Sequence, residues 1–167
     1  MDRSGDWITF KDMYSSKVFR LTDKGPVETT VIDFGKLAIP ERVYNMELRE
    51  AREVLNSKAT AGIFKYFENE QFIYLFFFIT APEDVPSDHY HWLVNKKTGS
   101  SILHQLPDAS DDHLYKGAKA LTVDNKLIFI GDEQMLKDPF FKNAESIKNS
   151  LTEESNPVII SLQIKDF

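Results

Sequence analysis

The sequence predicts a mostly β protein built from antiparallel meanders, and three observations lead to this prediction. Aromatic residues make up 13% of the 167 residues, and aromatic side chains favour strands. Strand-like runs are separated by turn residues such as Asp23-Lys24-Gly25-Pro26, in which glycine tolerates positive φ and proline cannot join a ladder. The run 71–80 is apolar at nearly every position. Such a strand has to be covered on both faces.

The strands are expected in three blade-like units, at about 6–34, 62–106 and 118–167. Alternation and β-branched content place the individual strands along the chain. In chain order they are expected at 6–13, 17–22, 27–34, 62–67, 71–80, 89–95, 100–106, 118–124, 126–131 and 158–164.

Two short helical insertions are predicted between these strands, at 46–55 and 140–151. In the first, Arg49 and Glu53 are spaced for an i,i+4 ion pair, and Asn45 is the expected N-cap. One face of this helix carries three apolar residues: Leu48, Ala51 and Leu55.

The two faces of the run 71–80 supply the main architectural argument. Phe72, Tyr74, Phe76 and Phe78 share one face, and the intervening residues give the opposite face an apolar character too. A propeller blade is a small sheet packed between neighbours on both faces, whereas a sandwich sheet leaves one face wet. The run therefore favours radially stacked sheets.

A weak internal repeat points the same way. Residues 17–34 and 90–108 have the same layout: a strand, a turn that contains lysine and glycine, a second strand and an aspartate. The hairpin at 118–131 begins a third unit. Repeated antiparallel meanders are typical of propellers and other radial β arrays. We therefore predict a single partial β-propeller domain of about three four-stranded blades. An α+β domain with two unrelated meanders is the alternative.

Composition limits the function classes. The net charge of −6 argues against a surface that tracks nucleic-acid phosphates. The absence of cysteine removes disulfides, thiolate metal sites and cysteine nucleophiles, and no cofactor motif is present. The first ten residues lack the apolar run of a signal peptide, and 72–79 is shorter than the about 20 residues of a membrane-spanning helix.

Several ordered segments resemble a bacterial six-bladed β-propeller family of unknown function, whose members are mostly cell-envelope proteins, often lipoproteins, of gut anaerobes. The matching segments are Lys17-Val-Phe-Arg-Leu-Thr, Val31-Ile-Asp-Phe-Gly-Lys-Leu with Pro40, Tyr74-Leu-Phe-Phe-Phe, Val94-Asn-Lys-Lys-Thr-Gly and Glu154-Ser-Asn-Pro-Val-Ile-Ile.

The resemblance covers the C-terminal half of that family, or about three blades of six. It implies a location in the periplasm or cell envelope, although this chain shows neither the family's secretion signal nor its lipid-bearing cysteine. Three blades leave two apolar faces, which a homodimer that closes the ring or the missing N-terminal blades would cover. An excised fragment, or a monomer whose helices cover the faces, is the alternative.

Metal binding is one candidate chemistry. His89 and His91, two positions apart on a predicted strand, project from one face, and Asp111 is the candidate carboxylate. Other groups expected nearby are Asp88, Asp112 and His113. The alternative is a pair of ordinary strand-edge histidines beside a solvated acidic loop. Tyr90 and Trp92 occupy the opposite face and are expected in the core.

Ligand binding through aromatic side chains is a second candidate. Trp7, Tyr14, Tyr44 and Tyr115 can line a glycan- or peptide-binding surface, although packing between blades explains each of them as well. The chain holds 26 acidic residues, so a chance carboxylate pair of glycosidase type carries no information, and no catalytic residue is predicted.

The sequence therefore favours a non-enzymatic binding or scaffold module of β-propeller type with a glycan or protein ligand. An envelope hydrolase or lyase, with a site completed by residues outside this chain, is the alternative. A structural domain whose open blade faces dock a partner is the third interpretation.

Overall fold

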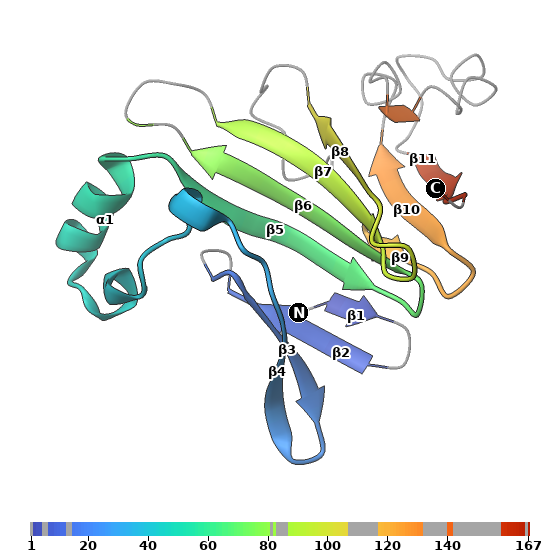
Figure 1. The fold of residues 1–167 in the computed structure, drawn as a ribbon, viewed down its shortest axis with the longest axis horizontal. Coiled ribbons are helices and arrows are strands. Elements are labelled where there is room, and N and C mark those ends of the chain that lie inside the picture. Colours follow the sequence, from blue (N-terminus) through green and yellow to red (C-terminus); the bar gives the residue numbers. More distant parts are fainter. Residues whose placement is uncertain are drawn as a thin grey trace.

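The structure, a computed structural model, describes residues 2–4, 7–12, 15–80, 82, 87–106, 117–131, 140–141, 158–165 and 167. These residues form three antiparallel sheets, with short helical segments between the first sheet and the second (Figure 1). The prediction of a mostly β fold built from antiparallel meanders is confirmed. In the described part of the chain, no helix is long and apolar enough to cross a membrane.

The first sheet is a meander in the order β1-β2-β3-β4. Its strands are β1 (Asp2–Ser4), β2 (Trp7–Lys11), β3 (Lys17–Thr22) and β4 (Gly25–Val31). β3 has its predicted bounds, whereas β4 starts and ends earlier than the predicted 27–34. Gly25 takes a φ of 106° in the tight turn, which allows the chain to reverse there. Strand β1 was not predicted, since its polar residues show no apolar alternation; Arg3 pairs opposite Ile8 of β2.

The middle sheet is a second meander, β5-β6-β7-β8. Its strands are β5 (Thr60–Glu68), β6 (Phe72–Thr80), β7 (Asp88–Asn95) and β8 (Ser101–Gln105). All four were predicted to within two residues at each end. The Asn95 side chain stabilises the β7–β8 turn, because its oxygen accepts hydrogen bonds from the backbone N–H groups of Lys97 and Thr98.

The third sheet has three strands among the described residues, in the order β11-β10-β9. They are β9 (Ala120–Leu121), β10 (Lys126–Gly131) and β11 (Val158–Gln163). The hairpin turn lies where the sequence predicted it, and Asn125 takes the left-handed conformation there, at φ 62°.

The helical segments correct the predicted N-cap. They are the 3-10 helices η1 (Gly35–Leu37) and η2 (Glu41–Asn45) and the helix α1 (Leu48–Asn56). Asn45 lies in η2 and is not the N-cap of α1; Glu47 holds that position without a capping side-chain bond. Leu48 is 80% exposed, so the predicted apolar face of α1 is not a core face. The predicted Arg49–Glu53 ion pair forms, at 3.3 Å. The helix predicted at 140–151 lies mostly outside the described residues.

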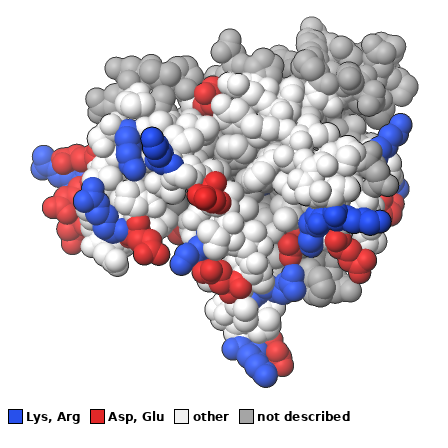
Figure 2. Space-filling view, in the orientation of Figure 1, with Lys and Arg blue, Asp and Glu red and all other residues white. Residues whose placement is uncertain are grey.

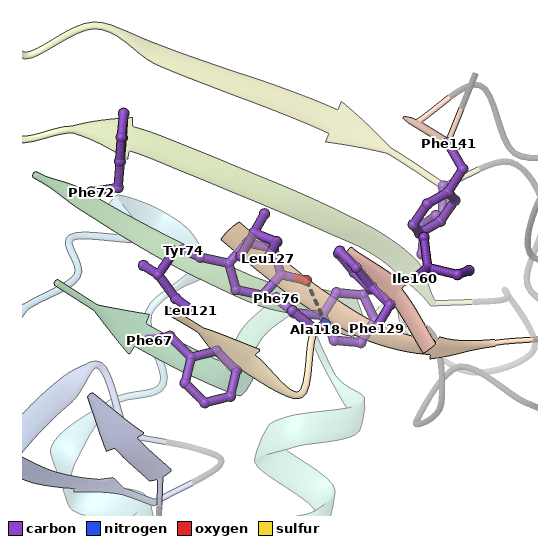
Figure 3. Packing of buried hydrophobic residues seen from close by; sticks show 11 residues of the cluster. Phe67, Phe72, Tyr74, Phe76, Ala118, Leu121, Leu127, Phe129, Phe141 and Ile160 are labelled. Atoms are coloured by element: carbon purple, nitrogen blue, oxygen red, sulfur yellow. Dashed lines mark hydrogen bonds between the residues drawn. The ribbon is translucent and has the colours of Figure 1, made fainter. Parts of the chain in front are cut away.

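Strand β6 is covered on both faces, as its sequence predicted. Phe72, Tyr74 and Phe76 pack in a cluster with Leu127 and Phe129 of the third sheet (Figure 3). On the opposite face of β6, Leu75 and Phe77 pack in a second cluster. This cluster also contains Val18 and Ile32 of the N-terminal segment. The middle sheet therefore lies between the first sheet and the third.

The three meanders also meet at one common edge. In each sheet the strand that comes first in the sequence is an edge strand: β1, β5 and β9. Each of these three strands contacts the other two (Figure 1). The chain therefore starts each sheet at the shared junction and adds later strands outward from it.

Candidate functional site

The predicted histidine pair lies in the core. His89 and His91 share the face of β7 that is turned toward the third sheet, and they are only 6% and 2% exposed. Because β7 pairs with β6 on one side and β8 on the other, the interpretation as strand-edge histidines is wrong. Tyr90 and Trp92 pack against the cluster on the opposite face, as expected, but are less buried than the histidines.

His91 belongs to a small polar network inside an aromatic cluster. Its Nδ1 is 2.7 Å from the Tyr74 hydroxyl, which also accepts a hydrogen bond from the Ala118 N–H at 3.0 Å. The His91 ring stacks on Phe140 with centroids 4.5 Å apart, and its cross-strand neighbour is His104. Burial raises the pKa of Tyr74 well above its usual value, so its phenol keeps its proton and can donate it to Nδ1.

Metal binding at this position stays a prediction. The Nδ1 atom of His89 is 3.0 Å from the Ser87 carbonyl oxygen, and the imidazole ring packs on the rings of Phe64 and Phe76. Asp111 lies outside the described residues. Among the residues the structure places, no group of three or more His, Asp or Glu side chains is arranged to hold a metal ion. The described neighbours of both imidazoles are mainly aromatic rings, which is a packing environment rather than a ligand set.

The four aromatic candidates for ligand binding are not brought together within the described residues. Tyr44 lies in η2 and is 48% exposed; partial burial and the carboxylates of Asp12 and Glu41 raise the pKa of its phenol. Trp7 is placed in β2 by its backbone alone, and Tyr14 and Tyr115 lie outside the described residues. A shared aromatic surface therefore stays a prediction.

A buried ion pair joins the first sheet to the middle sheet, and sequence reasoning missed it. The side chain of Glu68, at the end of β5, is 6% exposed. Its Oε1 accepts a hydrogen bond from Arg20 Nη2 at 2.8 Å, and its Oε2 accepts one from the Tyr66 hydroxyl at 2.9 Å. Lys96 Nζ lies 4.0 Å from the same carboxylate. The spacing of Val18 and Arg20 on β3 was the signal available in the sequence. Residues two positions apart share a strand face, so the arginine charge points the same way as the apolar Val18, toward a neighbouring sheet.

An amide network joins the middle sheet to the third sheet. The Asn69 side-chain N–H₂ donates to the Thr122 carbonyl and to Asn125 Oδ1, each at 2.8 Å. The Asn125 N–H₂ in turn donates to Gln71 Oε1 at 2.9 Å. This network and the Glu68 ion pair both lie at the β5–β6 turn. Each satisfies buried polar groups between sheets, so both serve packing and neither presents a reactive group.

The outer face of the first sheet, turned away from the middle sheet, carries apolar residues with charged residues beside them: Arg3 lies opposite Ile8, and Glu28, opposite Phe19, pairs with Lys17 at 3.5 Å. The strand register places Ile8 and Phe10 of β2 on this face beside Phe19 and Leu21 of β3. The rings of Phe10 and Phe19 stack with centroids 5.4 Å apart, and Leu21 is 45% exposed. Val31 of β4, opposite Lys17, extends the same face and is 55% exposed.

The outer face of the third sheet likewise mixes apolar residues with polar ones, since Lys126, Ser161 and Gln163 share it. Ile130 and Ile159 are directly opposite each other on β10 and β11, and they are 46% and 72% exposed. Ile128 lies on the same face, paired with Ser161 and Ala120. Among the described residues, both end sheets therefore expose apolar side chains on the face turned away from the middle sheet.

Charged side chains do not form a competing site on the view in Figure 2. Acidic and basic groups lie interspersed around the margin, over α1 and over the tip of the β3–β4 hairpin, and neither sign forms a continuous patch. This distribution fits a solvated surface rather than a surface that selects one sign of charged ligand.

The chain was compared with family models, with curated proteins and with solved structures, and none of the three comparisons found a match.

Proposed function

We propose that the chain is a non-enzymatic docking module of β-propeller type, whose two outer sheet faces bind β-sheet surfaces of protein. The arrangement of the sheets supports the blade interpretation. Three meanders begin at a shared inner edge formed by β1, β5 and β9, and the middle sheet is packed on both faces. Propeller blades are built and stacked in this way.

One observation carries the docking function: both end sheets expose apolar side chains on the face that a further blade would cover. Leu21 and Val31 expose about half of their surface on one side, and Ile159 exposes 72% on the other. Apolar patches of this kind on soluble proteins usually mark interfaces. The faces carry phenylalanine and isoleucine beside charged groups such as the Lys17–Glu28 pair, and a mixture of exposed apolar and charged side chains is common at protein interfaces.

The cell-envelope location and the count of six blades rest on the family resemblance. The hydrolase or lyase alternative has no observation of its own among the described residues, because the buried polar groups there join the sheets to one another. A glycan ligand likewise rests on Tyr44 and the three undescribed aromatic side chains.

Site-specific photo-cross-linking in cells tests the docking function. The photoreactive residue p-benzoylphenylalanine replaces Leu21 on one outer face or Ile159 on the other. Val123, which is 80% exposed in the β9–β10 turn, is the matched control position. We expect light-dependent protein adducts at both outer-face positions and none at Val123, with the cross-linked peptides identified by mass spectrometry. Adducts at none of the positions, or equally at all three, would contradict the proposal.

A further inference from the structure

Strand β8 is the outer edge of the middle sheet, and its backbone is open on one side (Figure 1). Among the described strands, it pairs only with β7. The Leu106 N–H donates to the His89 carbonyl at 2.8 Å, so every second residue back from Leu106 directs its N–H and C=O groups toward β7. The residues between them are Ser101, Leu103 and Gln105, whose backbone groups therefore point away from the sheet.

The side chains of β8 leave this edge accessible. Ile102 and Leu103 lie on opposite faces of the strand and are 48% and 58% exposed. The strand contains no proline, lysine, arginine, aspartate or glutamate, and no bulge interrupts its pairing with β7. Natural proteins usually protect an edge strand with such features, because a regular edge without them pairs with other strands. β8 therefore has the properties of a strand that accepts a partner strand.

The outer strands of the other two sheets differ from β8. In β4, Pro26 has no N–H to donate, and Glu28 would meet a like charge if two such strands paired around it. In β11, Ile159 is 72% exposed but Ile160 is fully buried. A strand added beside β8 can therefore cover exposed apolar side chains on both faces of the sheet, whereas one added beside β11 can do so on one face.

We infer that β8 pairs with β8 of a second copy of this chain, in an antiparallel arrangement whose two-fold axis passes beside Leu103. Leu103 then lies opposite Leu103 of the second copy, and Ser101 lies opposite Gln105. All three residues with outward backbone groups form hydrogen bonds in this register. Centring the pair on Ile102 or His104 instead would leave one of them opposite a residue outside the strand.

The side chains of β8 match one another in this register, which is why a second copy fits the edge. Leu103 packs on its own counterpart, the Ser101 hydroxyl lies beside the Gln105 amide, and the side chain of Ile102 lies beside the ring of His104. Closed two-fold symmetry is also the commonest form of homo-oligomer. The inference goes beyond the proposed function, because it uses an edge of the middle sheet and leaves the outer faces of the first and third sheets free.

Sedimentation velocity of the purified chain across a dilution series tests the pairing. We expect a dimer of twice the 19.3 kDa chain mass at the upper end of the series. Because Leu103 faces its own counterpart across the axis, L103D should bring two negative charges together, and L103K two positive charges. Each variant alone should be monomeric at concentrations at which the unaltered chain is dimeric.

An equimolar mixture of L103D and L103K should recover the dimer, because opposite charges then meet across the axis. This recovery requires a two-fold contact at Leu103, and it also shows that both variants are folded. Two controls place a charge elsewhere: V123D in the β9–β10 turn and S161D on β11. Both should dimerise like the unaltered chain.

A single introduced cysteine gives a second measurement, since the chain contains none of its own. Opposed Cα atoms in a hydrogen-bonded pair lie about 5.5 Å apart, which a disulfide can bridge. Mild oxidation should therefore link L103C into a covalent dimer and leave V123C monomeric.

The inference is overturned if the unaltered chain is monomeric throughout the series, or if the dimer persists in L103D or L103K. It is equally overturned if neither the mixture nor oxidised L103C forms dimers. A dimer lost in S161D but kept in L103D would overturn it by assigning the contact to β11. Cross-linking at the outer faces in cells does not depend on β8, so the proposed function fails or stands separately.

Discussion

At the scale of single residues, Glu68 brings a negative charge into the contact between the first and middle sheets. Arg20 Nη2, the Tyr66 hydroxyl and Lys96 surround its carboxylate. Burial of a carboxylate is costly unless a partner and hydrogen bonds compensate for the lost water. The position of these groups suggests that the pair fixes how the two sheets lie against each other.

Replacing Arg20 by methionine should therefore reduce stability, because Glu68 would keep its charge with its main partner gone. Removing one partner of a fully buried pair costs about 3–5 kcal/mol. Because the Arg20 side chain is 30% exposed, we expect about 2 kcal/mol in the free energy of unfolding, measured by urea denaturation.

The matched control is Arg49→Met, which breaks the exposed Arg49–Glu53 pair of α1. Exposed helix pairs contribute only about 0.3–0.5 kcal/mol, so this variant should unfold almost like the unaltered chain. Equal losses in the two variants would show that the buried position of Glu68 has no special effect.

At the scale of elements, β6 is the strand on which the packing depends. Its Phe76 ring is fully buried and contacts the segment that leads into β9. A methyl group at Gly117 would lie 2.6 Å from Phe76 Cδ1, so the absence of a side chain there allows the close approach. Glycine is required at this position by the neighbouring sheet rather than by its own backbone conformation.

Gly117→Ala should accordingly destabilise the fold by about 1–3 kcal/mol through overpacking, because the added methyl group would press on the fully buried Phe76 ring. Phe76→Leu alone should also destabilise the protein by leaving a cavity. The double variant should be more stable than the sum of the two losses, since the smaller side chain makes room for the methyl group. Additive losses in urea denaturation would contradict this contact.

The helix α1 shows that the spacing of apolar residues predicts a helix but not its burial. Its spacing predicted a helix almost where one forms, and the Arg49–Glu53 pair followed from the same spacing. Leu48 on the apolar face is nonetheless 80% exposed, because an apolar helical stripe is buried only where another element lies against it. The polar strand β1 shows the converse, since its pairing with β2 gives it a strand conformation that its side chains do not predict.

At the scale of the whole molecule, the two clusters beside β6 bury tyrosine hydroxyls between sheets. Burial is the largest cause of the raised pKa of Tyr66 and of Tyr74, each with an unperturbed value of 10.0. Both phenols therefore remain protonated in the folded protein at a pH where the unfolded chain has released these protons.

Stability should consequently fall as the pH rises above about 10, by up to about 1.4 kcal/mol per pH unit for each tyrosine. The sign follows because the unfolded state binds fewer protons than the folded state in this range; below pH 10 the contribution is fully present. Tyr74→Phe should reduce the slope of the free energy of unfolding against pH by the contribution of one tyrosine. The same variant should lower stability at neutral pH, because it leaves the Ala118 N–H unpaired. Denaturation at several pH values measures both effects, and an unchanged slope in Tyr74→Phe would contradict this assignment.

The sequence by itself determined most of the strands, although not β1, and the need to cover 71–80 on both faces. It also predicted that His89 and His91 share a face. These features follow from the period-two geometry of a strand, which is a local property of the chain. The structure agrees with them at β6 and at β7.

Only the tertiary structure decided which sheet covers which face. It buried the two histidines, placed Arg20 against Glu68 and Asn69 against Asn125, and left Leu48 exposed. Arg20 and Glu68 are 48 positions apart, and Asn69 and Asn125 are 56 apart. The physical reason is that such contacts depend on how whole sheets stack, and alternation along one strand carries no information about the side chain that meets it from another sheet.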